Sequence, residues 1–177
     1  MTKKTWKLFW DLQCPYSKKN WENFPALQKE FGKDYDFSIH LTSLAFHPQA
    51  FPAQCAATLI QTYKGRDAMM DFVDVCYKSQ DLYTNAAMGD CRKSDVKNVF
   101  AKIAEENGFL DDVLTKEKFL AECDDWDKAI KPAFVEHKEA LLYGVYGTPK
   151  SVIDEQLVAD TESSWGPQEW AEKLKTL

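Results

Sequence analysis

The chain has 177 residues, of which 45% are hydrophobic and 28% are charged, and its formal net charge is −6. This length suits one domain, or one core that carries a sizeable insertion, and the composition is globular rather than disordered. The lysines form no basic stripe, which argues against a nucleic acid as partner. No window approaches the roughly 18 uninterrupted apolar residues of a membrane span, so we expect no contact with a membrane.

Cysteine usage indicates a reducing environment. The chain has five cysteines, an odd number, and none of them form a Cys-x-x-Cys pair. This pattern fits a reducing compartment better than a disulfide framework. The N-terminal segment lacks the long apolar stretch and the small-residue cleavage site of a secretory signal. We therefore expect a cytoplasmic location, unless a leader has been removed.

The N-terminal part of the chain predicts a strand, a helix and a second strand. Residues 4–12 alternate, with Trp6 and Phe9 on opposite faces, which is typical of a strand buried on both sides. Apolar residues at helical spacing follow up to Gly32, and residues 35–44 alternate again. Two strands joined by one helix form a βαβ unit, so we expect them to lie parallel.

The rest of the chain predicts a helical block, a hairpin and a last helix. Residues 48–142 carry only helical periodicity, ending in a helix from 126 to 142. Strand character returns at 150–153 and 156–158, separated by a two-residue turn, which predicts a β-hairpin. Gly166-Pro167 then opens an amphipathic helix. The predicted order is β-α-β, helical insertion, β-β-α, an α/β fold.

A Cys14-Pro15-Tyr16-Ser17 turn joins the first strand to the first helix. Open α/β sheets react beyond the carboxyl ends of their strands. Pro15 suits the first helical position, where its missing N–H costs nothing. The Cys14 sulfur then faces unpaired N–H groups and the positive end of the helix dipole, which favour a thiolate. Ser17 is placed to donate to that thiolate, although a buried structural Cys14 is the alternative reading.

A second motif, Gly147-Thr148-Pro149, directly precedes the third strand. In this order of elements, a cis bond before Pro149 would set a backbone edge beside Cys14. The sequence leaves the isomer open, because most X-Pro bonds are trans.

Together these stretches resemble a known family. WDLQCPYSKKNW, followed some 130 residues later by YGVYGTPKSVI with a helical block between, is similar to the DsbA-like thioredoxin family. That family includes the kappa-class glutathione transferases and the hydroxychromene carboxylate isomerases. The resemblance covers essentially the whole chain. It implies a thioredoxin-like domain made of residues 1–47 and 143–177, with residues 48–142 as a helical insertion.

The resemblance also implies roles for the motif residues. Cys14 takes the nucleophile position, and Ser17 replaces the second, resolving cysteine of the oxidoreductases. Pro15 and Tyr16 match the centre of the motif. Thr148-Pro149 takes the place of the cis-proline turn, whose backbone would pair with a bound peptide or glutathione.

Two further serines join the predicted site. Ser163 and Ser164 stand where thioredoxin-fold proteins hold the glutamyl carboxylate of glutathione, although a capping loop is the simpler reading. The cysteine and histidine spacings match no zinc pattern, so we expect no metal. Cys55 or Cys91 could act as a resolving thiol, but core packing is the simpler reading for Cys55.

The resemblance implies a thiol–disulfide oxidoreductase with a single active-site cysteine. Without a cysteine at position 17, an external thiol must resolve a mixed disulfide on Cys14, and glutathione is the obvious candidate. Expected partners are therefore glutathione and protein thiols or disulfides. Two alternatives stay open, a glutathione-dependent transferase or isomerase and a non-catalytic binding module. The oligomeric state also stays open, with a homodimer as one option.

Overall fold

Four strands form one mixed sheet in the computed structural model, which describes residues 2–177. The strands are β1 (Lys4–Trp10), β2 (Tyr35–Leu41), β3 (Lys150–Ile153) and β4 (Gln156–Val158), in the order β2-β1-β3-β4. β1 runs parallel to β2 and antiparallel to β3, and β3 pairs antiparallel with β4. The predicted parallel pair and the predicted hairpin are both confirmed.

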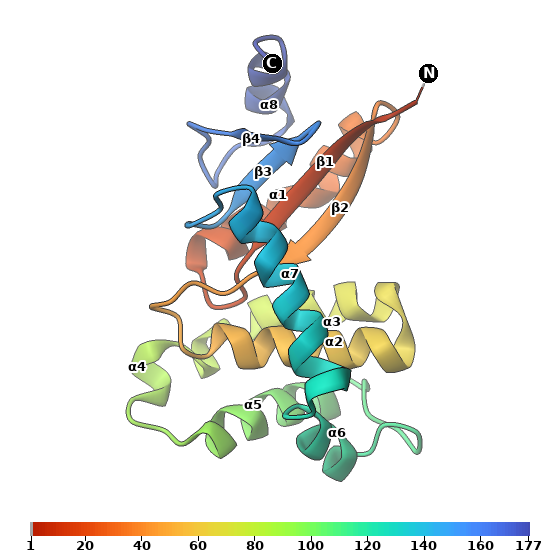
Figure 1. The fold of residues 1–177 in the computed structure, drawn as a ribbon, viewed down its shortest axis with the longest axis vertical. Coiled ribbons are helices and arrows are strands. Elements are labelled where there is room, and N and C mark those ends of the chain that lie inside the picture. The colour runs from red at the N-terminus through yellow and green to blue at the C-terminus, as the bar shows by residue number, and fades with distance from the viewer. Residues whose placement is uncertain (1) are drawn as a thin grey trace.

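Helices cover both faces of this sheet (Figure 1). On one face lie α1 (Pro15–Phe31) and α8 (Pro167–Leu174), and the ring centres of Trp6 and Trp170 are 4.6 Å apart. On the other face Phe9 packs with Ala140 of α7 (Lys131–Leu142). The prediction that β1 is buried on both sides is therefore confirmed, and β1 is the centre of the core.

Between β2 and β3 all regular secondary structure is helical, as predicted. The segment contains α2 (Ala50–Lys64), α3 (Arg66–Lys78), the 3₁₀ turn η1 (Gln80–Leu82), α4 (Asn85–Met88), α5 (Lys93–Glu106), α6 (Lys116–Glu122), the π-helical turn η2 (Trp126–Ile130) and α7. Among residues 2–177, no helix combines the length and the apolar character needed to cross a membrane.

Helix α7 belongs to both parts of the molecule. Near its start, Gln54 of α2 donates to the Ala133 carbonyl oxygen at 2.8 Å. Near its end, Ala140 packs on the sheet, and Figure 1 shows α7 running from the helical block to the front of the sheet. The last helix of the predicted insertion thus also supplies the cover for the second sheet face.

Three predicted boundaries differ from the structure. The two strands end at Trp10 and Leu41, because beyond them the Leu44 N–H donates to the Asp11 carboxylate instead of to the ladder. The helix predicted from residue 126 begins as a wide turn, in which the Ile130 N–H reaches the Asp125 carbonyl oxygen at 3.1 Å. Pro132, two residues after the end of that turn, has no N–H to continue regular helix bonding.

Candidate functional site

The candidate nucleophile lies at the junction of β1 and α1. Cys14 is the N-cap residue of α1 with extended backbone angles (φ −77°, ψ 121°), and Pro15 is the first helical residue, as predicted. The Cys14 Sγ lies 3.4 Å from the carbonyl oxygen of Thr148. Cys14 is buried, with 2% of the residue exposed.

The turn before β3 is the second wall of the site. The Thr148–Pro149 peptide bond is cis. Because β3 is antiparallel to β1, its first residues lie beside the last residues of β1, with Lys150 opposite Phe9. This register brings Thr148 to Cys14, although 134 residues separate them in the chain.

A pocket of about 470 Å³ opens next to this turn. Its lining includes five residues predicted from the sequence as substrate contacts, namely Tyr16, Thr148, Pro149, Ser163 and Ser164. Lys19, Gly147, Lys150, Thr161 and Glu162 complete the lining. Pro15, also predicted as a contact, is exposed but does not line the pocket. The volume lies within the roughly 300–1,000 Å³ range of small-molecule sites.

The pocket offers polar groups to a ligand. The Thr148 Oγ1 is buried and has no hydrogen-bond partner within residues 2–177. A buried hydroxyl without a partner is costly unless a ligand or water supplies one. Lys19 and Lys150 add positive charge, against one carboxylate from Glu162. The Asn23 side chain of α1 donates to the Ser164 carbonyl oxygen at 3.2 Å and ties the serine loop to the helix.

Ser17 has a different role from the predicted one. Its side chain is fully buried, and its Oγ accepts the Asp11 N–H at 3.2 Å rather than donating to Cys14. A hydrogen bond with Ser17 also acts on the Tyr77 hydroxyl, but burial and the nearby Asp11 and Cys14 dominate and raise the pKa of Tyr77 well above its usual value. Ser17 therefore fastens the start of α1 to the end of β1.

Asp11 is a site residue that the sequence reading missed. It is fully buried, and its Oδ1 accepts the N–H groups of Gln13 at 2.7 Å and Cys14 at 3.2 Å. Its Oδ2 accepts the Leu44 N–H at 2.8 Å and lies 2.9 Å from His47 Nδ1. An aspartate whose side chain bonds the N–H two residues on is an Asx-turn, a signal that the stretch Asp11-Leu12-Gln13 does carry.

The helical insertion holds the backbone just before Cys14. The Tyr77 hydroxyl donates to the Asp11 carbonyl oxygen at 3.3 Å. The Gln80 side chain donates to the Leu12 carbonyl oxygen at 2.9 Å. The Tyr83 hydroxyl shares its hydrogen between that oxygen, at 3.1 Å, and the Cys76 carbonyl oxygen, at 2.7 Å. The contacts with Asp11 and Leu12 cross 66 to 71 residues, and no local pattern in the sequence indicates them.

Solved structures share this fold at low sequence identity. A candidate protein-disulfide isomerase from Pseudomonas syringae matches with a TM-score of 0.76 at 15% identity, covering 97% of this chain and 93% of that one. BdbD from Bacillus subtilis, in its oxidised form, matches at 0.70 and 18% identity, covering 97% and 86%. Alpha-DsbA1 from Wolbachia pipientis matches at 0.70 and 13%, covering 99% and 86%. No protein-family model and no curated protein matches the sequence.

This chain has the DsbA-like thioredoxin fold. The predicted fold class, with its helical insertion between β2 and β3, is confirmed.

Within the DsbA-like fold, three other cysteines are part of the core. Cys55, Cys76 and Cys123 are buried, as predicted. Burial raises the pKa of Cys55 and of Cys123 to about 12. It also raises the pKa of Cys76. Cys91 is partly exposed in the loop after α4. Of these four thiols, Cys91 is the most accessible to a reagent in solution.

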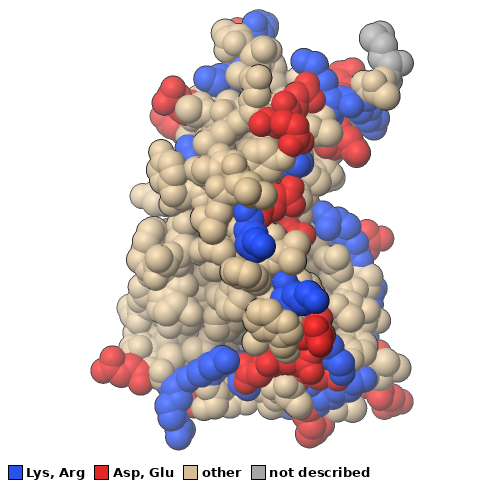
Figure 2. Space-filling view, viewed as in Figure 1, with Lys and Arg blue, Asp and Glu red and all other residues tan. Residues whose placement is uncertain are grey.

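Exposed aromatic side chains belong to the segments that form the site. Tyr16 in the active-site turn, Phe46 in the loop after β2 and Tyr146 before Gly147 are each more than half exposed, and Tyr146 reaches 88%. Figure 2 shows a broad area without charged side chains beside α7, over the loop that precedes β3 and the start of α1. An uncharged surface that carries exposed aromatic side chains suits contact with another protein.

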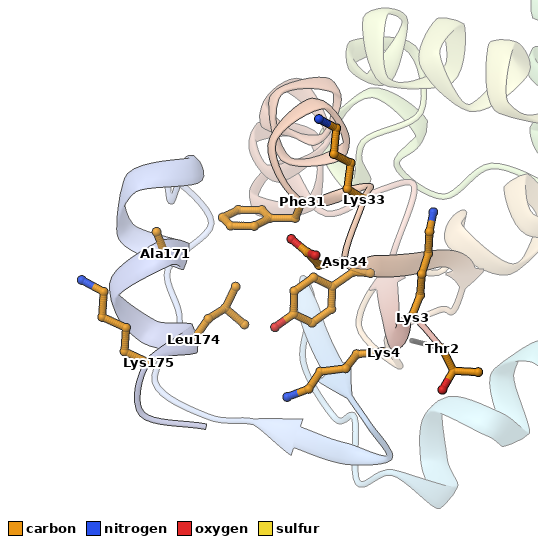
Figure 3. Close-up of a pocket in the computed structure, with 10 residues that line it drawn as sticks. Thr2, Lys3, Lys4, Phe31, Lys33, Asp34, Ala171, Leu174 and Lys175 are labelled. Atoms are coloured by element: carbon orange, nitrogen blue, oxygen red, sulfur yellow. The ribbon is translucent and has the colours of Figure 1, made fainter.

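A larger pocket, of about 530 Å³, opens at the opposite end of the sheet (Figure 3). Phe31, Tyr35 and Leu174 contribute apolar surface, and lysines stand around them. The Lys3 ammonium already donates to the Gly32 carbonyl oxygen at 2.6 Å, and Lys175 pairs with Glu172 at 2.6 Å. The pocket offers no cysteine, so the candidate site is the one beside Cys14.

One cluster of possible metal ligands lies between β2 and α7. His40 Nδ1 is 2.7 Å from Glu136 and 3.5 Å from Glu139. The Lys7 ammonium already lies 3.0 Å from Glu139 and supplies a cation there. We assign this cluster to ion pairing between the strand and the helix.

Proposed function

We propose that the chain catalyses thiol–disulfide exchange through Cys14, and that an external thiol, glutathione, completes the cycle. The observation that carries the proposal is the position of the Cys14 sulfur. It lies at the N-terminus of α1, 3.4 Å from the Thr148 carbonyl oxygen and next to the cis bond before Pro149. A helix N-terminus stabilises a thiolate, which is the nucleophile in disulfide exchange.

The reaction balances with one protein thiol. The Cys14 thiolate attacks one sulfur of a substrate disulfide, forms a mixed disulfide and expels the second sulfur as a thiolate. A glutathione thiolate then attacks the substrate sulfur of the mixed disulfide. This step releases a substrate–glutathione disulfide and restores the Cys14 thiolate. Ser17 is buried and carries a hydroxyl, so it takes no part in electron transfer.

The pocket beside Thr148 supports glutathione as the second substrate. Glutathione carries two carboxylates, and Lys19 and Lys150 line the pocket together with Ser163 and Ser164. The Thr148 Oγ1 is buried in this turn without a hydrogen-bond partner within residues 2–177. The backbone edge next to a strand end suits an extended peptide such as glutathione.

The surface around Cys14 supports a protein as the disulfide substrate. Exposed Tyr16, Phe46 and Tyr146 belong to the three segments that meet at the site. MdbA of Corynebacterium diphtheriae, which shares the fold at a TM-score of 0.65 and 17% identity, is described as a thiol-disulfide oxidoreductase. We extend the proposal to a reducing compartment, because all five cysteines, each within the described residues, are free thiols.

Intact-mass analysis after treatment with oxidised glutathione tests the proposal. Wild type should gain one glutathione adduct that is released by reduced glutathione, and Cys14→Ser should gain none at the same rate. Cys91→Ser is the matched control and should behave as wild type. An adduct that persists in Cys14→Ser, or the absence of any adduct in wild type, would contradict the proposal.

A glutathione-dependent transferase or isomerase is the second candidate. The polar pocket favours it, since glutathione binding there does not require a disulfide. In that case conjugation of an electrophile to glutathione should survive Cys14→Ser. Calorimetry with reduced glutathione separates the two, because absence of binding eliminates this candidate while leaving exchange with protein thiols open.

A non-catalytic module that binds other proteins is the third reading, which the exposed aromatic side chains favour. Its signature would be unchanged binding of a partner peptide by Cys14→Ala, together with wild-type Cys14 that alkylates no faster than Cys91.

A further inference from the structure

The Asp11 carboxylate connects the Cys14 turn to the loop between β2 and α2. One oxygen accepts the N–H groups of Gln13 and Cys14, and the other accepts the Leu44 N–H and contacts His47 Nδ1. A single side chain thus makes four polar contacts, two on each segment. The backbone carbonyl oxygen of Asp11 also accepts the Cys14 N–H at 3.1 Å. Asp11 therefore holds the backbone conformation of Cys14, which is itself the N-cap residue of α1 and makes no capping bond with its own side chain.

A buried carboxylate at this position has an electrostatic consequence. Asp11 is fully buried, so water does not screen its charge, and its Oδ1 is within hydrogen-bond reach of the Cys14 N–H. A thiolate on Cys14 would place a second negative charge in the same buried turn, and like charges repel each other more strongly where the dielectric constant is low. An uncompensated Asp11 would therefore oppose a thiolate on Cys14.

Among residues 2–177, His47 is the one side chain in contact with the Asp11 carboxylate that can carry a positive charge. Its Nδ1 lies 2.9 Å from the Asp11 carboxylate, and 13% of its side chain is exposed. The other side chains at Asp11 carry no positive charge. Ser17 contributes a hydroxyl, and Tyr77 stays a neutral phenol because burial raises its pKa. The balance of charge beside Cys14 thus depends on the imidazole.

We propose that Asp11 and His47 are positioning residues for Cys14. Asp11 holds the turn through its hydrogen bonds, and a proton carried by the His47 imidazole at the Asp11 carboxylate would offset the negative charge that opposes a Cys14 thiolate. The inference rests on the proposed function, since it assigns these residues to the same nucleophile.

Two nearly isosteric variants separate charge from shape. His47→Gln keeps an N–H donor for Asp11 but removes the positive charge, and Asp11→Asn keeps an acceptor for Gln13 and Cys14 but removes the negative charge. At pH 7, His47→Gln should slow alkylation of Cys14 by iodoacetamide about tenfold, and Asp11→Asn should speed it several-fold. The double variant should resemble Asp11→Asn. A purely structural role predicts instead that Asp11→Asn slows the reaction and that His47→Gln leaves it unchanged.

Site-resolved mass spectrometry measures the rates, with Cys91 in the same molecules as internal reference. Asp34→Asn, which removes a carboxylate at the opposite end of the sheet, is the matched control and should leave the rate unchanged. Thermal unfolding identifies any variant that does not fold. If Asp11→Asn fails to fold, the His47→Gln rate decides alone, and an unchanged rate overturns the inference.

The result is distinguishable from failure of the proposed function. If wild-type Cys14 alkylates no faster than Cys91, the nucleophile assignment and this inference both fail. If wild-type Cys14 is fast but the two variants shift its rate in the same direction, only the inference on Asp11 and His47 fails.

Discussion

At the scale of single residues, the five thiols of this protein differ through their surroundings alone. Cys76 lies inside α3 against the core, whereas Cys14 caps the start of α1. Burial penalises the thiolate at Cys76, and free N–H groups at a helix start favour it. The same side chain is therefore inert in one place and a candidate nucleophile in the other.

The buried thiols should resist modification in the folded protein. Because burial raises the pKa of Cys55 and Cys123 to about 12, only about one thiol in ten thousand is ionised at pH 8. We expect N-ethylmaleimide to leave Cys55, Cys76 and Cys123 unmodified at pH 8 while Cys91 reacts. In denaturant all five should react. Modification of native Cys76 at the rate of Cys91 would show that the core opens readily.

Replacing Ser17 by cysteine should convert the chemistry from one thiol to two. Position 17 lies on the first turn of α1, three residues after Cys14, which is the spacing of dithiol oxidoreductases. In Ser17→Cys, a Cys14–glutathione adduct should be released by the new thiol, leaving an internal disulfide and free glutathione. Intact mass under non-reducing conditions measures this outcome. The experiment belongs in a Cys91→Ser background, where a persistent adduct would show that the two thiols do not meet.

At the scale of elements, the helical insertion is part of the active-site support. The 3₁₀ turn η1 and the tyrosine after it donate to the Leu12 carbonyl oxygen, and α3 donates to that of Asp11. Because these bonds are buried, their loss leaves backbone groups unpaired. The insertion thus fixes the path of the backbone between the end of β1 and Cys14.

Removing both donors to Leu12 should loosen the turn. Gln80→Leu combined with Tyr83→Phe leaves that buried carbonyl oxygen without a side-chain donor, at a cost of about 1–3 kcal/mol in the free energy of unfolding. Gln80→Leu alone retains the Tyr83 hydroxyl and should cost less than the double variant, whereas Tyr83→Phe alone also loses the 2.7 Å bond to the Cys76 carbonyl oxygen. Urea unfolding measures the stabilities, and the rate of glutathione adduct formation reports the turn. If a single variant costs as much free energy of unfolding as the double variant, the one remaining donor does not satisfy the Leu12 carbonyl oxygen, which contradicts the prediction.

At the scale of the whole molecule, the buried ionisable groups should make stability fall at alkaline pH. In the folded chain Cys55, Cys76 and Cys123 keep their protons well above the ordinary thiol pKa of 9.0, whereas in the unfolded chain they ionise near it. The folded state therefore binds more protons above pH 9, and stability decreases as pH rises. Each thiol contributes about 1.4 kcal/mol per pH unit in that range.

Urea unfolding at pH 8 and pH 10 measures this dependence. Wild type should lose several kcal/mol, and Cys76→Ala should lose less between the same two pH values, because one titrating thiol is missing. The comparison within each variant removes the effect of the cavity that the alanine leaves. Equal losses in the two proteins would mean that Cys76 is not shielded from water.

The sequence by itself determined the features that depend on residues close together in the chain. Alternation and helical spacing are local, so the order of elements, the burial of β1 on both faces and the place of Cys14 at the helix start could be predicted. The resemblance to the DsbA-like family implied that Tyr16, Thr148, Pro149, Ser163 and Ser164 belong to one site, and all five line one pocket.

Only the tertiary structure decided which groups satisfy buried polar atoms. Ser17 was expected to face Cys14, but the Asp11 N–H takes its oxygen. Asp11 and the donors from the insertion were not predicted as site residues, because the groups that they meet across the fold lie 33 to 71 residues away. A buried donor or acceptor must be paired, but the sequence does not say which segment will supply the partner. Around Cys14, the packing of the insertion against the end of β1 determines which side chains pair with the buried backbone groups.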